Sequence, residues 1–218
     1  MMKNRRPLRR AIQGDIMTIR VFDVGELTIE FNASAVYDSW EESMRDILDE
    51  DEEFIDFDGV GGNRQFAPLS PMGMDDLRVL SIKESQHLHD IQEGHRTIND
   101  ILEAEEELWD DDQVDPYMIL DIGVRTVVMA LLELGAEPFS SCNGGSFPDD
   151  ERHAESHPLV AMYGSDEVLA MVEYAAKKHQ CGLYVTDGFG AKGALVLYAD
   201  DIRKFIPVAH EFFRLEFD

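Results

Sequence analysis

The sequence predicts an α+β fold, a two-layer sandwich in which helices cover one face of a largely antiparallel sheet. A nearly all-apolar helical pattern is followed by two pairs of short strand-like runs. A second helical pattern separates these pairs, and a third comes after them. The order is therefore αββαββα, and helices joined by antiparallel strand pairs are typical of α+β sandwiches.

The chain before this unit is predicted to form a hairpin and helices. Thr18–Phe22 and Leu27–Phe31 both alternate apolar and polar residues, and a turn sequence lies between them. A short helix should follow, because Ser39 and Glu42 have the spacing of a capping box. Residues 59–73 contain four glycines and two prolines, so we interpret them as a loop.

Two longer helices are expected next. Apolar residues recur at steps of three and four through 86–109, which predicts an acidic amphipathic helix interrupted at Gly94. A second helix is predicted over Tyr117–Leu134, after a capping Asp115, and Gly135 should end it. That helix is apolar nearly all round, so it should be the central buried one.

The rest of the chain alternates between strands and helices. The predicted strands are 137–141, 159–163, 183–186 and 194–198, with one helix from the cap Ser165 to His179 and a last helix capped by Asp200. Pro207 lies inside that last helix and should kink or split it.

The charge is uneven along the chain. The 218 residues carry a formal net charge of −26; residues 1–135 have 12 basic and 31 acidic side chains, and 136–218 have 7 and 14. Eleven acids lie in 38–58 and eight in 103–115. We predict a basic N-terminal arm (1–15), an acidic region of hairpin and helices (16–112) and an α+β domain (113–218).

Composition limits the cellular locations and the classes of partner that we expect. No apolar run approaches the roughly 20 residues of a membrane span, so no membrane association is expected. Two cysteines are too few for a disulfide framework, which favours a cytoplasmic location. The acidic charge disfavours nucleic acid as a partner and attracts basic proteins, although solubility or adaptation to high salt would also explain it.

The most unusual local sequence is the run from Phe139 to Ser146, which follows a predicted strand. Its glycines allow close approach of a ligand to the backbone, and its cysteine is a candidate nucleophile or metal ligand. The candidate ligand-binding residues of this loop are Ser140, Ser141, Asn143, Gly144 and Gly145. The alternative is a polar hairpin loop with an inert cysteine.

The Ser-Ser-Cys part of this loop resembles that of the wybutosine-synthesising tRNA methyltransferase family, where the loop also follows a helix and precedes a histidine. The resemblance covers six residues. Here Asn143-Gly144-Gly145 replace the family's continuation and the basic character is absent. It therefore indicates loop geometry, and neither tRNA binding nor methyl transfer is carried over.

Histidines near this loop suggest two kinds of chemistry. Cys142 with His153 or His157 would form a nucleophile and base pair, which requires only proximity in space. Alternatively, zinc would be held by Cys142, His153, His157 and Cys181, although their spacing is not that of a zinc finger.

Charged residues elsewhere in the chain are further candidates for the same predicted pocket. Asp121 and Arg125 are four apart on the buried helix and should share a face, so they would form an ion pair or line the pocket. Lys192 lies in the glycine-rich segment 187–193, which we interpret as a hairpin connection whose lysine would meet a substrate anion.

The leading hypothesis is an accessory or regulatory protein. Its acidic part would bind a protein partner, and the loop around Cys142 would bind a small ligand. The alternatives are an enzyme that uses Cys142 with His153 or His157, and a nucleic-acid mimic or immunity-type inhibitor that binds a basic protein.

Overall fold

The computed structural model describes residues 18–31, 36, 69, 71–109, 116–148, 150, 155–187 and 193–215. The strands are β1 (Ile29–Glu30), β2 (Glu137–Cys142), β3 (Leu159–Tyr163), β4 (Gly182–Thr186) and β5 (Ala194–Tyr198). The helices are α2 (Met74–Gln92), α3 (Ile98–Trp109), α4 (Arg125–Glu133), α5 (Asp166–His179) and α6 (Phe205–Leu215), with short 3₁₀ helices η3 (Pro116–Ile119) and η4 (Ile202–Lys204).

These strands form one sheet in the order β1-β4-β5-β3-β2. The pairs β2–β3, β3–β5 and β4–β5 are antiparallel, and β1 joins the edge of β4 in parallel. The predicted α+β class with a largely antiparallel sheet is therefore confirmed. Strands β3 and β5 have the predicted bounds, because their apolar, β-branched runs are delimited by turn residues.

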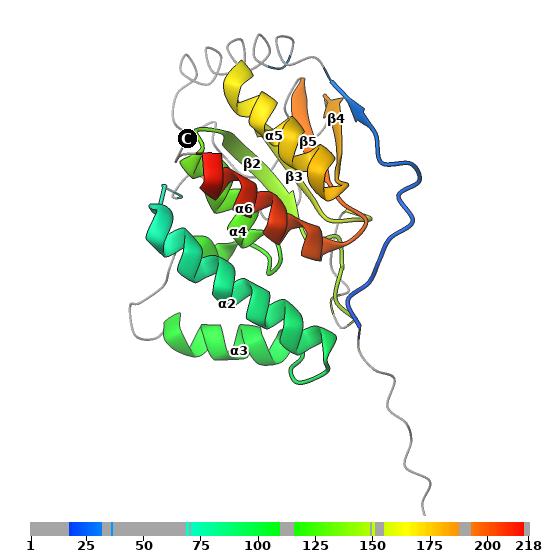
Figure 1. Cartoon of the computed structure of the whole chain (residues 1–218). Helices are drawn as coiled ribbons and strands as arrows, with labels where there is room; N and C mark the ends of the chain where they lie inside the picture. Colours follow the sequence, from blue (N-terminus) through cyan, green and yellow to red (C-terminus); the bar gives the residue numbers. More distant parts are fainter. Residues whose placement is uncertain are drawn as a thin grey trace, which may run out of the picture.

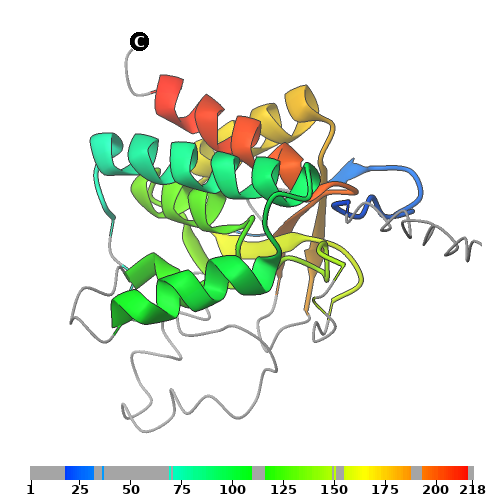
Figure 2. The ribbon, with the colours of Figure 1, turned by 90° about the horizontal axis from the view of Figure 1, so that it is seen from below.

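Helices α4, α5 and α6 cover one face of the sheet, and α2 packs on α4 and α6 (Figure 1). Helix α3 lies below α2 in the view of Figure 1, and Figure 2 shows that it is set well apart from α2. The long side chains of Lys83 on α2 and Glu105 on α3 approach to 3.9 Å. One hydrophobic cluster joins these layers, with Ile91 of α2, Ile101 of α3, Leu131 of α4 and Phe205 of α6 among its buried members. The helices from the acidic region thus share a core with the αββαββα unit.

The opposite face of the sheet carries a second, smaller cluster of Leu159, Ala161, Val196 and Tyr198. Val24 and Leu27, from the segment 18–31, pack against this cluster. The first segment of the described chain is therefore part of the fold.

The predicted hairpin over Thr18–Phe22 and Leu27–Phe31 is wrong. The backbone N–H of Arg20 donates to the carbonyl of Ser146 at 2.8 Å, and that of Phe22 donates to Asp200 at 2.7 Å. Downstream, β1 pairs with β4. Both segments alternate as edge segments do, but each takes its backbone partners from distant parts of the chain.

The two long predicted helices are both interrupted. The pattern over 86–109 belongs to α2 and α3, which are separated at Gly94 as expected, although α2 begins earlier, at Met74. The continuous helix predicted over Tyr117–Leu134 is wrong. The chain forms η3, turns at 120–124, where Gly123 has a φ of 97°, and begins α4 at Arg125.

Several predicted helix ends are confirmed. Gly135 follows α4 with a φ of 89°, and the Ser165 hydroxyl accepts from the N–H of Val168 at the start of α5. Pro207 lies in the first turn of α6, where helix N–H groups have no intrahelical acceptor, so it neither kinks nor splits that helix. The predicted helix 39–48 and most of the loop 59–73 lie outside the described residues.

Candidate functional site

The loop after β2 is a compact turn built around Asn143. The Asn143 side-chain oxygen accepts from the N–H of Gly145 at 2.9 Å, and its carbonyl accepts from the Ser146 hydroxyl at 2.5 Å. The N–H of Gly144 donates to Cys142 Sγ at 3.2 Å. The polar groups of Asn143, Gly145 and Ser146 therefore bind one another in the manner of an Asx turn.

Distant residues hold this turn from outside. Asp121 accepts from the N–H of Asn143 at 3.2 Å, and Asp150 accepts from the Asn143 side-chain amide at 2.9 Å. The Arg20 guanidinium donates to the carbonyls of Gly145 and Pro148 at 3.1 and 3.3 Å. Sequence reasoning missed Arg20, because nothing local marks a residue that binds a loop more than a hundred positions away.

The loop is buried. Asn143 and Ser146 are 1% and 0% exposed, and Cys142 is 8% exposed. Ser140 and Ser141 are also buried, and the Ser141 hydroxyl has no hydrogen-bond partner among the described residues. A ligand would therefore have to displace existing hydrogen bonds in order to bind here.

Gly144 brings His157 next to the loop. Its φ is 66°, and a Cβ at this position would lie 2.1 Å from the carbonyl carbon of His157, so the two backbones are in direct contact. The His157 ring packs edge-on against Tyr198 at 5.5 Å, and its Nδ1 lies 3.0 Å from the Ser156 hydroxyl. Burial lowers the pKa of His157, although Glu155 acts in the opposite direction.

The structure does not bring the second cysteine to this corner. Cys142 pairs across the sheet with Leu159, which pairs with Tyr198, which pairs with Gly182. Cys181 precedes Gly182, so the two cysteines lie at opposite ends of a row that spans four strands, roughly 14 Å. Burial raises the pKa of the Cys181 thiol to about 12.

Among the residues that the structure describes, no three His, Cys, Asp or Glu side chains are placed to hold a metal ion. His153 and Lys192, which the sequence also suggested as site residues, lie outside those residues. Of the two histidines predicted to pair with Cys142, only His157 therefore lies within the described residues.

Asp121 and Arg125 serve separate clusters. Asp121 precedes α4 and supports the loop, as given above. Arg125 is the first residue of α4, and its guanidinium donates to Glu105 at 2.7 Å and to the carbonyl of Leu120 at 2.9 Å. The two residues do not occupy one helix, so the expected i,i+4 relation is absent.

A buried charged cluster, which the sequence reasoning missed, lies between α2, α3 and the start of α4. Glu84 is 2% exposed and accepts from the N–H groups of Gly123, Arg125 and Thr126 at 2.7, 3.1 and 2.8 Å. It therefore caps α4, which has no side-chain cap of its own. The available signal was an acid at an apolar-face position of α2, between Leu80 and Leu88.

The remaining members of this cluster are Glu105, Lys83 and His87. The Glu105–Arg125 ion pair is buried, with side chains 8% and 3% exposed, and Lys83 Nζ lies 3.9 Å from Glu105. Burial lowers the pKa of His87 to about 4, despite the opposing effect of Glu105. These buried charges are paired, as expected for groups that hold helices together.

The outer sides of α2 and α3 expose both apolar and acidic side chains. Val79 and Ile82, one turn apart on α2, are 65% and 71% exposed. Leu102 of α3 is 43% exposed. The acids exposed on α3 are Asp100, Glu103, Glu106 and Glu107. We call Leu102 and these four acids of α3 the outer helical face.

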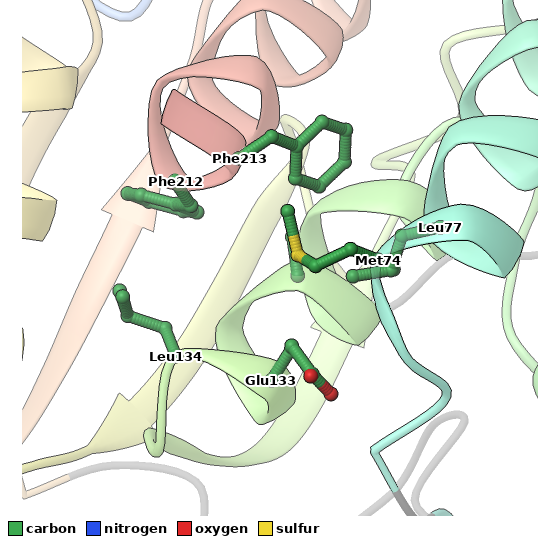
Figure 3. A pocket seen from close by; sticks show the side chains of 7 residues that line it. Met74, Leu77, Glu133, Leu134, Phe212 and Phe213 are labelled. Atoms are coloured by element: carbon green, nitrogen blue, oxygen red, sulfur yellow. The ribbon is translucent and has the colours of Figure 1, made fainter. Parts of the chain in front are cut away.

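A small cavity of about 10 Å³ lies between α2, α4 and α6 (Figure 3). Six apolar residues and Glu133 line it: Met74, Leu77, Ala130, Leu134, Phe212 and Phe213. Ligand and cofactor sites measure roughly 300–1,000 Å³, so this cavity is too small for a cofactor.

No helix in the described ranges is long and apolar enough to cross a bilayer. Comparison of the chain with protein-family models, with curated proteins and with solved structures finds no match.

Proposed function

We propose that the protein is a cytoplasmic acidic accessory protein that binds a basic protein partner through the outer helical face. The observation that carries this proposal is the arrangement of α3. Its inner residues Ile98, Ile101 and Glu105 are buried, and its four outer acids point to solvent. No basic residue lies within α3 itself.

Charge placed in this way acts on a partner at a distance. A surface of one sign steers an oppositely charged protein toward it, and that steering weakens as salt shortens the Debye length. Ten acidic and three basic side chains lie in 71–109, so the local field has the same sign as the whole molecule. A basic protein is therefore the favoured partner, and nucleic acid and membranes are disfavoured.

The test is copurification from the native host at low ionic strength. The matched variants are Glu103→Gln, Glu106→Gln and Glu107→Gln together, and Glu26→Gln, Glu137→Gln and Glu167→Gln together, since both sets change the charge equally. We expect one basic partner, released by salt and weakened about tenfold or more by the α3 set alone. Recovery of nothing, or equal loss with both sets, would refute the proposal.

The small-ligand function of the Cys142 loop receives less support, because most of its polar groups already bind one another.

An enzyme based on Cys142 remains a second proposal, favoured by the contact between Gly144 and His157. Iodoacetamide should then alkylate Cys142 faster than a free cysteine, at a rate that His157→Gln lowers. Alkylation of Cys142 slower than that of free cysteine would eliminate the enzyme.

The partner's identity tests the mimicry hypothesis. A nucleic-acid-binding protein that releases this chain when DNA or RNA is added would indicate mimicry of a phosphate backbone. A basic partner that ignores added nucleic acid would indicate an ordinary accessory role.

A further inference from the structure

We infer that the turn 120–124 couples helix α3 to the loop after β2, so that the ion pair between Glu105 and Arg125 keeps the loop around Cys142 closed. This inference goes beyond the proposed function, because it concerns how two parts of the chain act on one another and does not depend on a partner. A partner that holds α3 in place would then keep the loop closed as well.

At the α3 end, the connection is a buried ion pair. Glu105 accepts from the Arg125 guanidinium at 2.7 Å, and the two side chains are 8% and 3% exposed. Through Nε the same guanidinium donates to the carbonyl of Leu120 at 2.9 Å. One buried side chain therefore holds α3 and the turn together. Arg125 needs the acid in order to stay buried, because a guanidinium without a partner is strongly unfavourable in the interior.

At the loop end, the turn makes two contacts. Asp121, which follows Leu120, accepts from the backbone N–H of Asn143 at 3.2 Å. Gly123 lies beside Phe147, since a Cβ added to this glycine would be 3.7 Å from the tip of that ring. Leu120 and Asp121 are adjacent in sequence, so a shift of the turn that breaks the bond of Arg125 to Leu120 also displaces the acceptor of the loop.

Glu84 limits how far such a shift extends. It accepts from the N–H groups of Gly123 and Thr126 at 2.7 and 2.8 Å, and so holds the far end of the turn and the start of α4. Loss of the Glu105 contact should therefore loosen the part of the turn around Leu120 and Asp121 and leave α4 in place. The opening that follows is local to the loop.

The thiol of Cys142 can report this opening. In the closed loop it is 8% exposed, and Sγ accepts from the Gly144 N–H at 3.2 Å. Loop opening should limit how fast a reagent reaches it, so its alkylation rate follows the opening equilibrium. Cys181 is 2% exposed and lies in another part of the fold, so it serves as an internal reference for global unfolding.

The test compares two buried acids by their effects on the two thiols. Glu105→Ala is the test variant, and Glu211→Ala on α6 is its matched control. Glu211 is 5% exposed and contacts the side chains of Lys178 and His179 at 2.7 and 3.2 Å, close to Cys181 in sequence. Mass spectrometry follows the reaction of each cysteine of the full chain with iodoacetamide under native conditions. Glu105→Gln, which removes the charge and keeps the size, replaces Glu105→Ala if that variant does not fold.

We expect Glu105→Ala to speed the alkylation of Cys142 about tenfold and to leave that of Cys181 unchanged, because one hydrogen bond to a charged group has this effect on an opening equilibrium. Glu211→Ala should leave Cys142 unchanged. Equal acceleration of both thiols by Glu105→Ala would indicate global unfolding and overturn the inference. An unchanged Cys142 rate, or the same acceleration of Cys142 by Glu211→Ala, would overturn it too.

A second variant tests the route through the turn. Asp121→Ala removes the acceptor of the Asn143 N–H and should open the loop by itself, so addition of Glu105→Ala should raise the Cys142 rate little further. Coupling between two sites is reciprocal, so Asp121→Ala should also speed hydrogen exchange over 98–109 and leave α5 unchanged. Independent, multiplying effects of the two substitutions on the Cys142 rate, or unaltered exchange in α3, would show that α3 and the loop are not coupled.

Discussion

Glu84 carries a charge into the interior because the start of α4 supplies three donors for it. Without this carboxylate the first N–H groups of α4 would be buried unpaired, since Val124 has no side chain that accepts. A residue of α2 thus completes α4, and the two helices are coupled through hydrogen bonds as well as through packing.

Gly144 should tolerate no side chain, for two separable reasons. Gly144→Ala combines a left-handed backbone with a clash against the His157 backbone, whereas Gly94 has a similar φ of 69° and open space around it. We expect Gly94→Ala to lower the free energy of unfolding by about 1–2 kcal/mol. Gly144→Ala should lower it by about 4 kcal/mol or more. Urea denaturation measures both, and equal losses would show that the contact with His157 is soft.

His87 should make stability depend on pH in a defined window. Burial lowers its pKa to about 4 in the folded protein, and the unfolded chain titrates near 6.5. Between these values the unfolded chain binds a proton that the folded protein does not, so stability falls as the pH falls from 6.5 to 4. Above pH 6.5 His87 is neutral in both the folded and the unfolded state, so it no longer makes stability depend on pH.

The magnitude is about 1–2 kcal/mol, because His87 is partly exposed and solvent screens its neighbours. The measurement is the difference in unfolding free energy between the natural chain and His87→Gln across this pH range, in which other titrating groups cancel. Parallel pH profiles of the two proteins would contradict the assignment.

Helix α3 is attached by few residues, and one of them is charged. Ile98 and Ile101 pack inward, and Glu105 reaches Arg125 at the start of α4. A buried ion pair contributes little over apolar packing, but loss of one partner leaves the other charge buried and unpaired. The attachment of this helix therefore depends on that pair.

Glu105→Ala should lower the free energy of unfolding by about 3 kcal/mol and loosen α3 selectively. Hydrogen exchange followed by mass spectrometry should show faster exchange over 98–109, with α5 unchanged. Glu106→Ala, on the exposed side of the same helix, is the control and should change neither quantity. Equal protection of α3 in both variants would show that apolar contacts alone hold it.

Self-repulsion should govern the stability of the whole molecule. The protein has a net charge of −26, and its like charges lie closer together in the folded protein than in the unfolded chain. Added NaCl screens their repulsion and therefore stabilises the folded state. The melting temperature should rise by about 5 °C between 10 mM and 0.5 M NaCl. The triple glutamine variant of α3 should show a smaller rise. A melting temperature independent of salt would mean that the surface charges lie too far apart to interact.

Local pattern was sufficient for the central part of this fold. The runs 159–163 and 194–198 are apolar and bounded by turn residues, and Ser165 and Gly135 mark helix ends through their own side chain or backbone. These features depend on neighbours in sequence, so the residues themselves specify them.

Features that depend on distant partners were not predictable in this way. Segment 18–31 alternates like a hairpin, yet its backbone pairs with Ser146, Asp200 and Leu183. The apolar run through Gly123 predicts one continuous helix. The start of α4 at Arg125 cannot be predicted locally, because Glu84, which caps it, belongs to another helix. Likewise, the local sequence predicts the residues of the loop after β2 as a group, whereas the contacts of that loop with Arg20 and His157 follow from the topology.

The long reach of the N-terminal segment has a consequence for biosynthesis. Arg20 binds carbonyls 125 and 128 positions later, and β1 joins a strand that begins at Gly182. During translation this segment therefore emerges from the ribosome well before the residues that it binds have been synthesised. Translation that stops short of β4 should yield a polypeptide with an unpaired edge, a substrate for chaperones and proteases.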